Sequence, residues 1–271
     1  MIHETFKIEE KGSLDYARLV TYIWEESPEI CVKERPLVLV CPGGGYGFTS
    51  DREGEAVAVS FMNMGVHAAI LRYSVAPAEY PTALHEVARA VTILREHADE
   101  WYINKDKIVV MGFSAGGHLA ASYGAFWNDP ELAEAIGMSS EELRPAGTIL
   151  CYPVITSDDR YWHKGSFENL LGSQWSEEML EKMSIEKQVT ADFPKTFMWH
   201  TYTDALVPLE NSLLMAMALR RAGVSLEYHL YEEGVHGLSL AKPHTDSSIC
   251  DMVNKACQSW IDLAEVWLKN L

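Results

Sequence analysis

The chain has 271 residues, of which 48% are hydrophobic and 23% charged, so it can bury a large core. Its formal net charge is −17, and no cluster of Lys and Arg stands out, which argues against nucleic acid and anionic membrane surfaces as partners. No apolar run approaches the roughly 18 to 20 residues of a membrane-spanning helix. The N-terminus carries early acidic residues and no signal-peptide pattern, so we expect a cytoplasmic location.

The first 35 residues are compatible with two antiparallel strands. Beyond them, short apolar and β-branched runs recur at residues 37–41, 67–73, 107–112, 147–152, 196–201 and 225–231. These runs are continuous rather than alternating, which is typical of strands buried on both faces of a parallel sheet. Segments with helical spacing lie between or after them, at residues 53–64, 80–96, 116–126, 209–222 and 250–269. This alternation predicts an α/β fold, with helices on both faces of a mostly parallel sheet.

No linker, repeat or low-complexity tract interrupts the chain, so we expect a single domain over residues 1–271. The longest interruption between strands, at residues 157–192, is a candidate lid. Its aromatic residues are equally compatible with facing a substrate and with packing on one another: Tyr161, Trp162, Phe167 and Trp175. The tryptophan-bearing segment at 250–269 is expected to cover the sheet or a second copy of the chain, so homo-oligomerisation stays open.

The first glycine-rich loop lies early in the chain, directly after the predicted strand at residues 37–41. Three consecutive glycines, at 43–45, allow close approach of the backbone and turn N–H groups inward. A phosphate-binding loop is disfavoured because no Gly-Lys-Ser/Thr ending follows. We expect this loop to stabilise an oxyanion, with Gly44, Gly45 and Ala115 as the donors.

The nucleophile is expected in Gly-Phe-Ser-Ala-Gly, residues 112–116, between a predicted strand and a predicted helix. This is the setting that a nucleophilic serine in a Gly-x-Ser-x-Gly turn requires. The turn strains the serine backbone, and side chains at Gly112 and Gly116 would clash with neighbouring chain. Ser114 is therefore the predicted nucleophile, close to the positive end of the following helix.

The base and the acid should follow the serine in the order Asp or Glu, then His. His236 lies in a glycine-flanked loop after the last predicted strand, at the same sheet edge as Ser114. His244 is the alternative. Asp204 follows the strand before that of His236 and is the predicted acid, ahead of three competitors: Asp158, Asp159 and Asp192. The histidines lack metal-ligand spacing, so neither a metal nor a cofactor is expected.

The five cysteines are odd in number and unpatterned, which favours reduced structural thiols.

Several motifs together resemble the bacterial acetyl esterase and acetylxylan esterase-like α/β-hydrolases. They are Pro-Gly-Gly-Gly-Tyr at 42–46, Ser-Asp-Arg-Glu-Gly-Glu at 50–55, Leu-Arg-Tyr-Ser at 71–74, Gly-Phe-Ser-Ala-Gly-Gly-His at 112–118, Asp204 with Val207-Pro208, and Gly-Val-His-Gly at 234–237. Pro42 stands where lipase-like relatives have His before the glycines, and this departure favours the sugar-esterase branch.

The resemblance implies a serine esterase that removes acetyl or other short acyl groups from sugars or small oligosaccharides. The small-molecule ester would be attacked by Ser114, with His236 as base, Asp204 fixing its tautomer, and an acyl-enzyme released by water. Similar glycine loops occur in kynurenine formamidases and in peptidases, so an amide substrate is an open alternative. A non-catalytic binding protein on the same fold is disfavoured, because all three triad residue types occur in the expected order.

Overall fold

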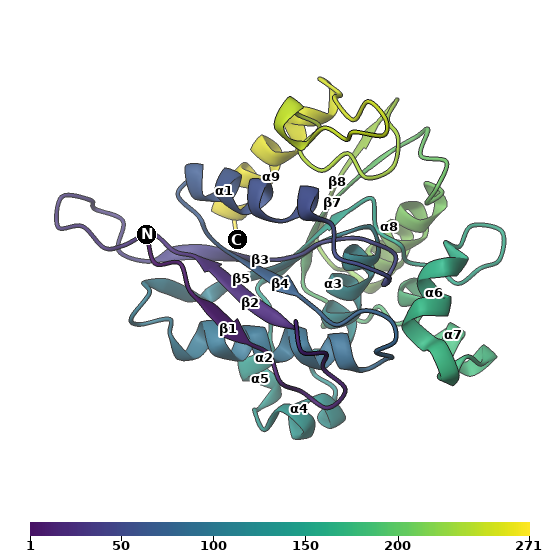
Figure 1. The fold of residues 1–271 in the computed structure, drawn as a ribbon, viewed down its shortest axis with the longest axis horizontal. Coiled ribbons are helices and arrows are strands. Elements are labelled where there is room, and N and C mark those ends of the chain that lie inside the picture. Colours follow the sequence, from purple (N-terminus) through teal and green to yellow (C-terminus); the bar gives the residue numbers. More distant parts are fainter.

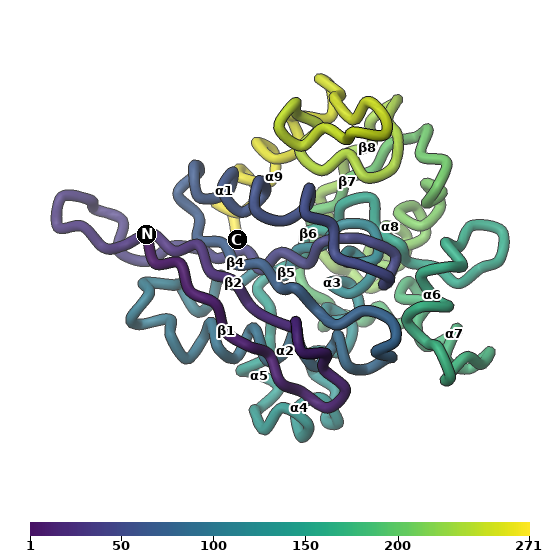
Figure 2. Tube along the Cα trace, viewed as in Figure 1, coloured from purple at the N-terminus to yellow at the C-terminus, as the bar shows by residue number.

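A computed structural model describes all 271 residues and contains one eight-stranded sheet, in the order β1-β2-β4-β3-β5-β6-β7-β8. β1 (Thr5–Lys7) pairs antiparallel with β2 (Arg18–Tyr22), and β2 pairs antiparallel with β4. The other pairs are parallel and join β3 (Arg35–Cys41), β4 (His67–Arg72), β5 (Ile103–Phe113), β6 (Gly147–Cys151), β7 (Lys195–Thr201) and β8 (Leu226–Tyr231). Each predicted run falls on one of these strands, and the two N-terminal strands form one edge of the sheet (Figure 2).

Helices cover both faces of the sheet. Successive residues of a strand point to opposite sides, so a continuous apolar run supplies hydrophobic side chains to both faces. In β3, Leu37 and Leu39 join one core and Val38 and Val40 join the other. α2 (Thr82–Glu96), α3 (Ser114–Phe126) and α8 (Glu210–Ala222) cover the first face, and α1 (Glu55–Asn63) and α9 (Trp260–Lys269) cover the second (Figure 1). This is the predicted α/β layering.

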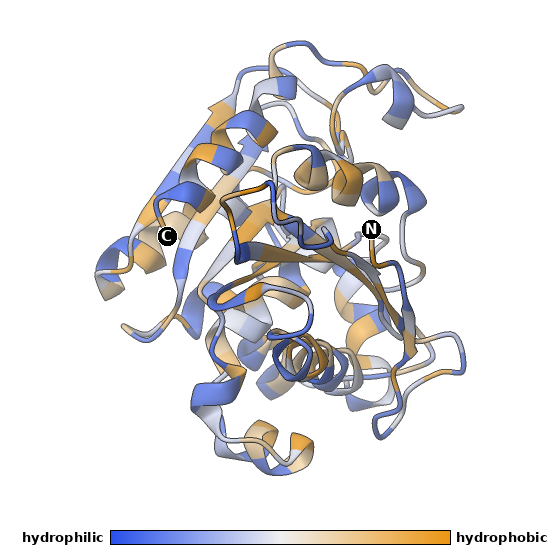
Figure 3. Cartoon of the chain, turned by 90° about the vertical axis from the view of Figure 1, so that its left-hand side faces the viewer, coloured by the Kyte–Doolittle hydropathy of each residue, from blue (hydrophilic) through white to orange (hydrophobic).

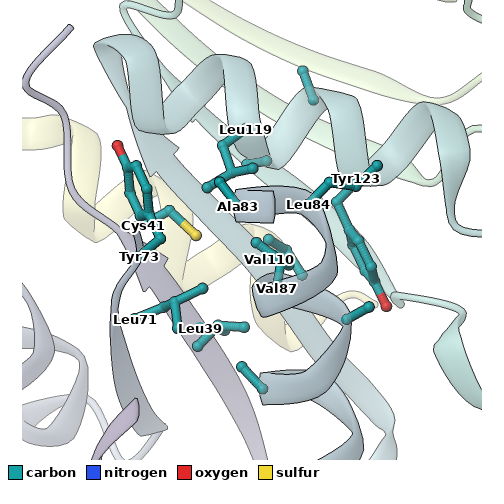
Figure 4. Close-up of a cluster of buried hydrophobic side chains, with 14 of the residues drawn as sticks. Leu39, Cys41, Leu71, Tyr73, Ala83, Leu84, Val87, Val110, Leu119 and Tyr123 are labelled. Atoms are coloured by element: carbon teal, nitrogen blue, oxygen red, sulfur yellow. The ribbon is translucent and has the colours of Figure 1, made fainter. Parts of the chain in front are cut away.

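Hydrophobic packing explains why these helices form where they do. In the larger core, Leu39, Leu71 and Val110 of the strands meet Val87 of α2 and Leu119 of α3 (Figure 4). Hydrophobic colouring concentrates in the sheet, whereas the helices mix hydrophobic and hydrophilic residues (Figure 3). Burying one stripe of each amphipathic helix fixes it against the sheet.

Hydrophobic periodicity does not predict the short helices of the structure. They are α4 (Pro130–Ile136), α5 (Ser140–Leu143), α6 (Lys164–Leu171) and α7 (Glu177–Lys182), with single 3-10 turns η1 (Asp51–Glu53), η2 (Gly172–Gln174), η3 (Ile185–Lys187), η4 (Pro243–Thr245) and η5 (Cys257–Ser259). α6, η2, α7 and η3 all belong to the insertion at 157–192. No helix in the protein has the length and apolar character needed to span a bilayer.

The helix predicted at 250–269 is wrong in its first turns, because residues 250–256 form no helix. Side-chain oxygens accept the backbone N–H groups there: Asp246 binds the Met252 N–H at 2.8 Å, and Asp251 binds that of Val253 at 2.9 Å. Such local bonds compete with helix formation. Asn254 then accepts from the N–H of Cys257 at 3.2 Å, where η5 begins. α9 follows and buries its tryptophans against the sheet.

Candidate active site

Ser114 lies at the junction of β5 and α3, with φ of +53°, in the left-handed region that non-glycine residues rarely adopt. A Cβ on Gly116 would overlap the carbonyl oxygens of Cys41 and Pro42, and one on Gly112 would overlap the carbonyl of Gly116. The steric need for both glycines is therefore confirmed. The tight turn brings β3 and α3 together and holds the serine in its strained conformation.

A continuous chain of hydrogen bonds links the three predicted triad residues. His236 Nδ1 lies 2.7 Å from Asp204 Oδ2, and His236 Nε2 lies 2.8 Å from Ser114 Oγ. Since a carboxylate accepts only, Nδ1 carries the proton, and Nε2 is left to accept from the serine hydroxyl. Ser114, Asp204 and His236 follow β5, β7 and β8, whose carboxyl ends share one sheet edge. The arrangement can take a proton from the serine as it attacks a carbonyl.

The Asp204 carboxylate is fully enclosed, with none of its side chain exposed, and accepts four hydrogen bonds. Oδ1 accepts from the N–H groups of Leu206 and Val207, each at 3.0 Å, while Oδ2 accepts from His236 and, at 3.2 Å, from His200. Burial acts to raise the pKa of Asp204, but hydrogen bonds from His200 and His236 outweigh it and hold that pKa well below its usual range. The group therefore stays ionised and fixes the orientation of His236.

His200 also contacts the Asp204 carboxylate, and the sequence does not reveal this contact. Its place in a buried strand predicts packing against a helix, and its Nδ1 does accept from Ser212 of α8 at 2.7 Å. Its Nε2–H, however, is directed at Asp204 and at the Val207 carbonyl, 3.1 Å away. The carboxylate thus contacts two histidines.

The glycine loop presents N–H groups beside the serine. Gly44 has φ of +134°, and a Cβ there would overlap the Phe48 carbonyl, so only glycine fits this turn. The N–H groups of Gly44 and Gly45 have no acceptor within the protein, and Ala115 is the second residue of α3, ahead of the intrahelical hydrogen bonds. These three predicted donors lie in segments that flank Ser114; their role in binding an oxyanion stays a prediction.

Glu53 holds this loop, and we did not predict it as a site residue. Its side chain is buried, and its Oε2 and Oε1 accept from the Gly43 N–H and the Tyr152 hydroxyl, both at 2.7 Å. Tyr152 in turn accepts from the Ser239 N–H at 2.8 Å. Burial raises the pKa of the Glu53 carboxyl, although both hydrogen bonds oppose the shift.

Arg52, the neighbour of Glu53, connects η1 to the histidine loop. Its Nη1 donates to the Gly237 carbonyl at 2.8 Å, and its Nε donates to the Thr245 carbonyl at 2.7 Å. The Ser239 hydroxyl donates to the Arg52 carbonyl at 2.6 Å. One short turn therefore contacts the glycine loop and the His236 loop together.

The insertion at 157–192 packs on the site through buried and polar contacts. His118 of α3 accepts from the Tyr46 hydroxyl at 2.9 Å and donates to the Met183 carbonyl at 2.8 Å. Burial lowers the pKa of His118 to about 4, so the ring is neutral. Asn169 of α6 donates to the Gly45 carbonyl at 2.8 Å. The insertion is thereby connected to the nucleophile helix and to the glycine loop.

The aromatic residues of the insertion largely contact one another. Trp162 lies 6.0 Å from Trp175 and 6.3 Å from Phe167 between ring centroids, and Phe167 meets His118 edge-on. Trp175 remains partly exposed. These contacts match the packing alternative, while a lid function stays a prediction.

The remaining candidates lie apart from the triad. His244 is exposed in η4, Asp158 pairs with Arg160, Asp159 is exposed, and the backbone carbonyl of Asp192 accepts from Trp127.

No group of three or more His, Cys, Asp or Glu side chains is arranged to hold a metal ion. The five cysteines form no disulfide; Cys41, Cys151 and Cys257 are buried and Cys31 and Cys250 are exposed.

Sequence similarity to known proteins covers most of this chain. The BD-FAE family model matches residues 26–219. Endo-1,4-beta-xylanase B of Butyrivibrio fibrisolvens is 39% identical over 77% of this chain and 33% of its own length. Acetylxylan esterase of Xylanibacter ruminicola is 30% identical over 72% of this chain and 39% of its own length. The chain thus spans between a third and two fifths of these relatives.

The structural likeness extends over nearly the whole chain. The acetyl ester-xyloside bifunctional hydrolase of Caldicellulosiruptor lactoaceticus superposes with a TM-score of 0.80 and 36% identity, covering 94% of this chain and 88% of that one. Likeness to this and other solved hydrolases confirms the α/β-hydrolase fold. The family model and this structural relative together establish that the chain belongs to the BD-FAE family and has an α/β-hydrolase fold.

Proposed function

We propose that the protein is a serine carboxylic-ester hydrolase that removes acetyl or other short acyl groups from sugars or small oligosaccharides. The observation that carries the proposal is the hydrogen-bond chain from Asp204 through His236 to Ser114. Relatives named acetylxylan esterase and acetyl ester-xyloside hydrolase support the sugar ester as substrate. The exposed aromatic side chains of Phe48 and Tyr202, in loops at the same sheet edge, offer surface for the apolar face of a pyranose.

The reaction follows from the positions of the proton donors and acceptors. Ser114 Oγ bonds to the ester carbonyl carbon while its proton passes to His236 Nε2, and Asp204 stabilises the resulting imidazolium. The carbonyl oxygen becomes an oxyanion held by the N–H groups of Gly44, Gly45 and Ala115. The carbon–oxygen bond to the alcohol then breaks, and His236 returns the proton to the leaving oxygen. Water, activated by the same histidine, releases the acid from Ser114.

The proposal is tested with p-nitrophenyl acetate and a fluorophosphonate probe. Ser114→Ala and His236→Ala are expected to lose hydrolysis, and Ser114→Ala is expected to lose labelling. His244→Ala is the matched control, because it removes an exposed histidine from a neighbouring segment, and it should keep wild-type rates. Undiminished hydrolysis by Ser114→Ala would contradict the mechanism.

A substrate panel separates the sugar-ester proposal from its alternatives. It comprises p-nitrophenyl esters from acetate to decanoate, acetylated xylo-oligosaccharides, N-formylkynurenine and a proline-peptide amide. We expect the highest kcat/KM for acetyl esters, with rates falling along the acyl series. Preference for either amide would instead favour the formamidase or peptidase alternative. The cytoplasmic location also stays a prediction, which cell fractionation would test.

A further inference from the structure

The start of α6 brings a histidine to the glycine loop. His163 directly precedes α6, and its Cε1 lies 3.7 Å from the position that a Cβ on Gly45 would occupy. Ser166 Oγ lies 3.8 Å from the same point. Asn169, on the same helix, donates to the Gly45 carbonyl at 2.8 Å. The insertion therefore meets the proposed oxyanion loop with polar side chains, while its aromatic rings pack on one another.

The contact with Ser166 determines which ring nitrogen of His163 carries hydrogen. Ser166 is buried, and His163 Nδ1, at 2.8 Å, is the one partner of its hydroxyl. The hydroxyl hydrogen needs an acceptor, so Nδ1 accepts and the neutral ring carries its hydrogen on Nε2. Burial lowers the pKa of His163, and the charge of His236 lowers it further while Asp204 opposes the shift, which favours this neutral ring.

The Nε2–H group of His163 is available to a ligand. No protein atom accepts from it, and it is not among the buried polar atoms that lack a partner. Its ring lies beside Gly45, and a Cβ on Gly43, two residues earlier in the same loop, would lie 2.9 Å from Ser114 Cβ, so the loop that the ring contacts also borders the serine. A hydrogen-bond donor is thus fixed in orientation, open to solvent, and adjacent to Gly45.

The chemistry of the ester indicates what this donor would bind. An acetyl group offers a methyl group and one carbonyl oxygen, and that oxygen is already assigned to the glycine loop. A further donor beside the loop can therefore contribute to recognition through the alcohol part. We propose that His163, oriented by Ser166, donates a hydrogen bond from Nε2 to a hydroxyl or ring oxygen of a polyol leaving group. This inference rests on the proposed esterase function and specifies its substrate class as acetylated polyols.

The test compares kcat/KM for an acetylated xylo-oligosaccharide with kcat/KM for p-nitrophenyl acetate, whose leaving group carries no hydroxyl beyond the ester oxygen. In His163→Ala, the ratio of the two values is expected to fall about tenfold, because a polar group of the substrate loses its partner. His163→Gln, which keeps a donor, should recover part of this ratio. Ser166→Ala should lower the ratio less, since it frees the tautomer without removing the ring.

Lys164→Ala is the matched control from the first turn of α6, where Lys164 is exposed and pairs with Glu168 at 3.0 Å. It should leave the ratio unchanged.

An equal loss on both substrates in His163→Ala would overturn the proposal, because it would mean that His163 supports the glycine loop instead of binding the leaving group. A wild-type enzyme that cleaves p-nitrophenyl acetate but no acetylated sugar would overturn it too, while leaving the esterase function intact. Failure of that function has a separate signature, namely hydrolysis of p-nitrophenyl acetate that survives Ser114→Ala. Melting temperatures identify any misfolded variant, in which case His163→Gln and Ser166→Ala decide the outcome.

Discussion

Replacing Glu53 with alanine removes the acceptor of two buried donors, the Gly43 N–H and the Tyr152 hydroxyl. Each buried donor left unsatisfied costs about 1–3 kcal/mol, so the free energy of unfolding should fall by roughly 2–6 kcal/mol. Glu53→Gln keeps one acceptor oxygen but turns an amide group toward the second donor. Its expected loss is about half as large, roughly 1–3 kcal/mol.

The activity of Glu53→Ala reports on the glycine loop, because Gly43 directly precedes the proposed oxyanion donors. With the Gly43 N–H no longer held, Gly44 and Gly45 lose their fixed position relative to Ser114. One misplaced oxyanion donor costs on the order of 10²-fold in kcat. We expect a fall of roughly 10- to 100-fold in kcat for p-nitrophenyl acetate, with little change in KM.

Urea unfolding and ester hydrolysis are measured side by side, with Glu55→Gln as the control. Glu55 is an exposed carboxylate in the same motif, and its substitution should change stability by no more than about 0.5 kcal/mol. Burial raises the pKa of Glu53, so the folded protein favours the protonated carboxyl. The contribution of this group to the free energy of unfolding is complete below the ordinary glutamate pKa and is lost as pH rises through the raised pKa. The stability advantage of the wild type over Glu53→Gln should therefore shrink with rising pH. If Glu53→Ala unfolds and reacts like Glu55→Gln, the buried carboxylate does not hold the loop.

Two further substitutions test the acid and the turn. Asp204→Asn should lower kcat about 10⁴-fold, because the amide no longer fixes the tautomer of His236. The pKa of Asp204 is lowered in the folded protein, so its contribution to stability is present above the ordinary aspartate pKa and lost as pH falls through the folded value. In thermal unfolding, the wild type should accordingly lose stability in acid more steeply than Asp204→Asn, and parallel curves would refute this. Gly116→Ala should destabilise by about 1–3 kcal/mol in urea, because its Cβ overlaps two carbonyl oxygens of β3 and the residue after it. In Gly165→Ala of α6, the new Cβ would meet nothing closer than 3.8 Å, so it should be neutral or stabilising by up to about 1 kcal/mol; equal losses in both variants would contradict the steric argument.

The residues that the sequence predicts best are those placed by a strand ending. Ser114, Asp204 and His236 each follow a continuous apolar run, and parallel strands bring such positions to one edge of a sheet. The glycine loop is found in the same way. Position within the strand pattern therefore predicts that these three side chains meet, although their contacts join residues 32 and 122 positions apart; their catalytic roles stay a prediction.

The supporting residues could not be found by that reasoning. Glu53 looks like an exposed acid at the start of a helix, and its hydroxyl partner Tyr152 is 99 positions away. His163 lies in a polar insertion with no hydrophobic period, so nothing local places it beside Gly45. At residues 250–256, the apolar stripe favours a helix, but carboxylate and amide oxygens of nearby side chains accept hydrogen bonds from the backbone N–H groups there. A hydrophobic pattern shows neither a hydrogen-bond partner far along the chain nor a side chain that competes for nearby backbone N–H groups.

The turn η1 also explains how two loops from different strands keep a common geometry. Glu53 binds the loop after β3 through Gly43, and Arg52 binds the loop after β8 through Gly237. Tyr152 closes the ring, since it donates to Glu53 and accepts from Ser239 of the histidine loop. A shift of η1 would therefore move the proposed oxyanion donors and His236 together rather than one against the other. Ser114 is fixed by its own strand and helix, so catalysis requires that both loops keep their positions relative to it. Two adjacent residues, Arg52 and Glu53, hold the two loops in those positions.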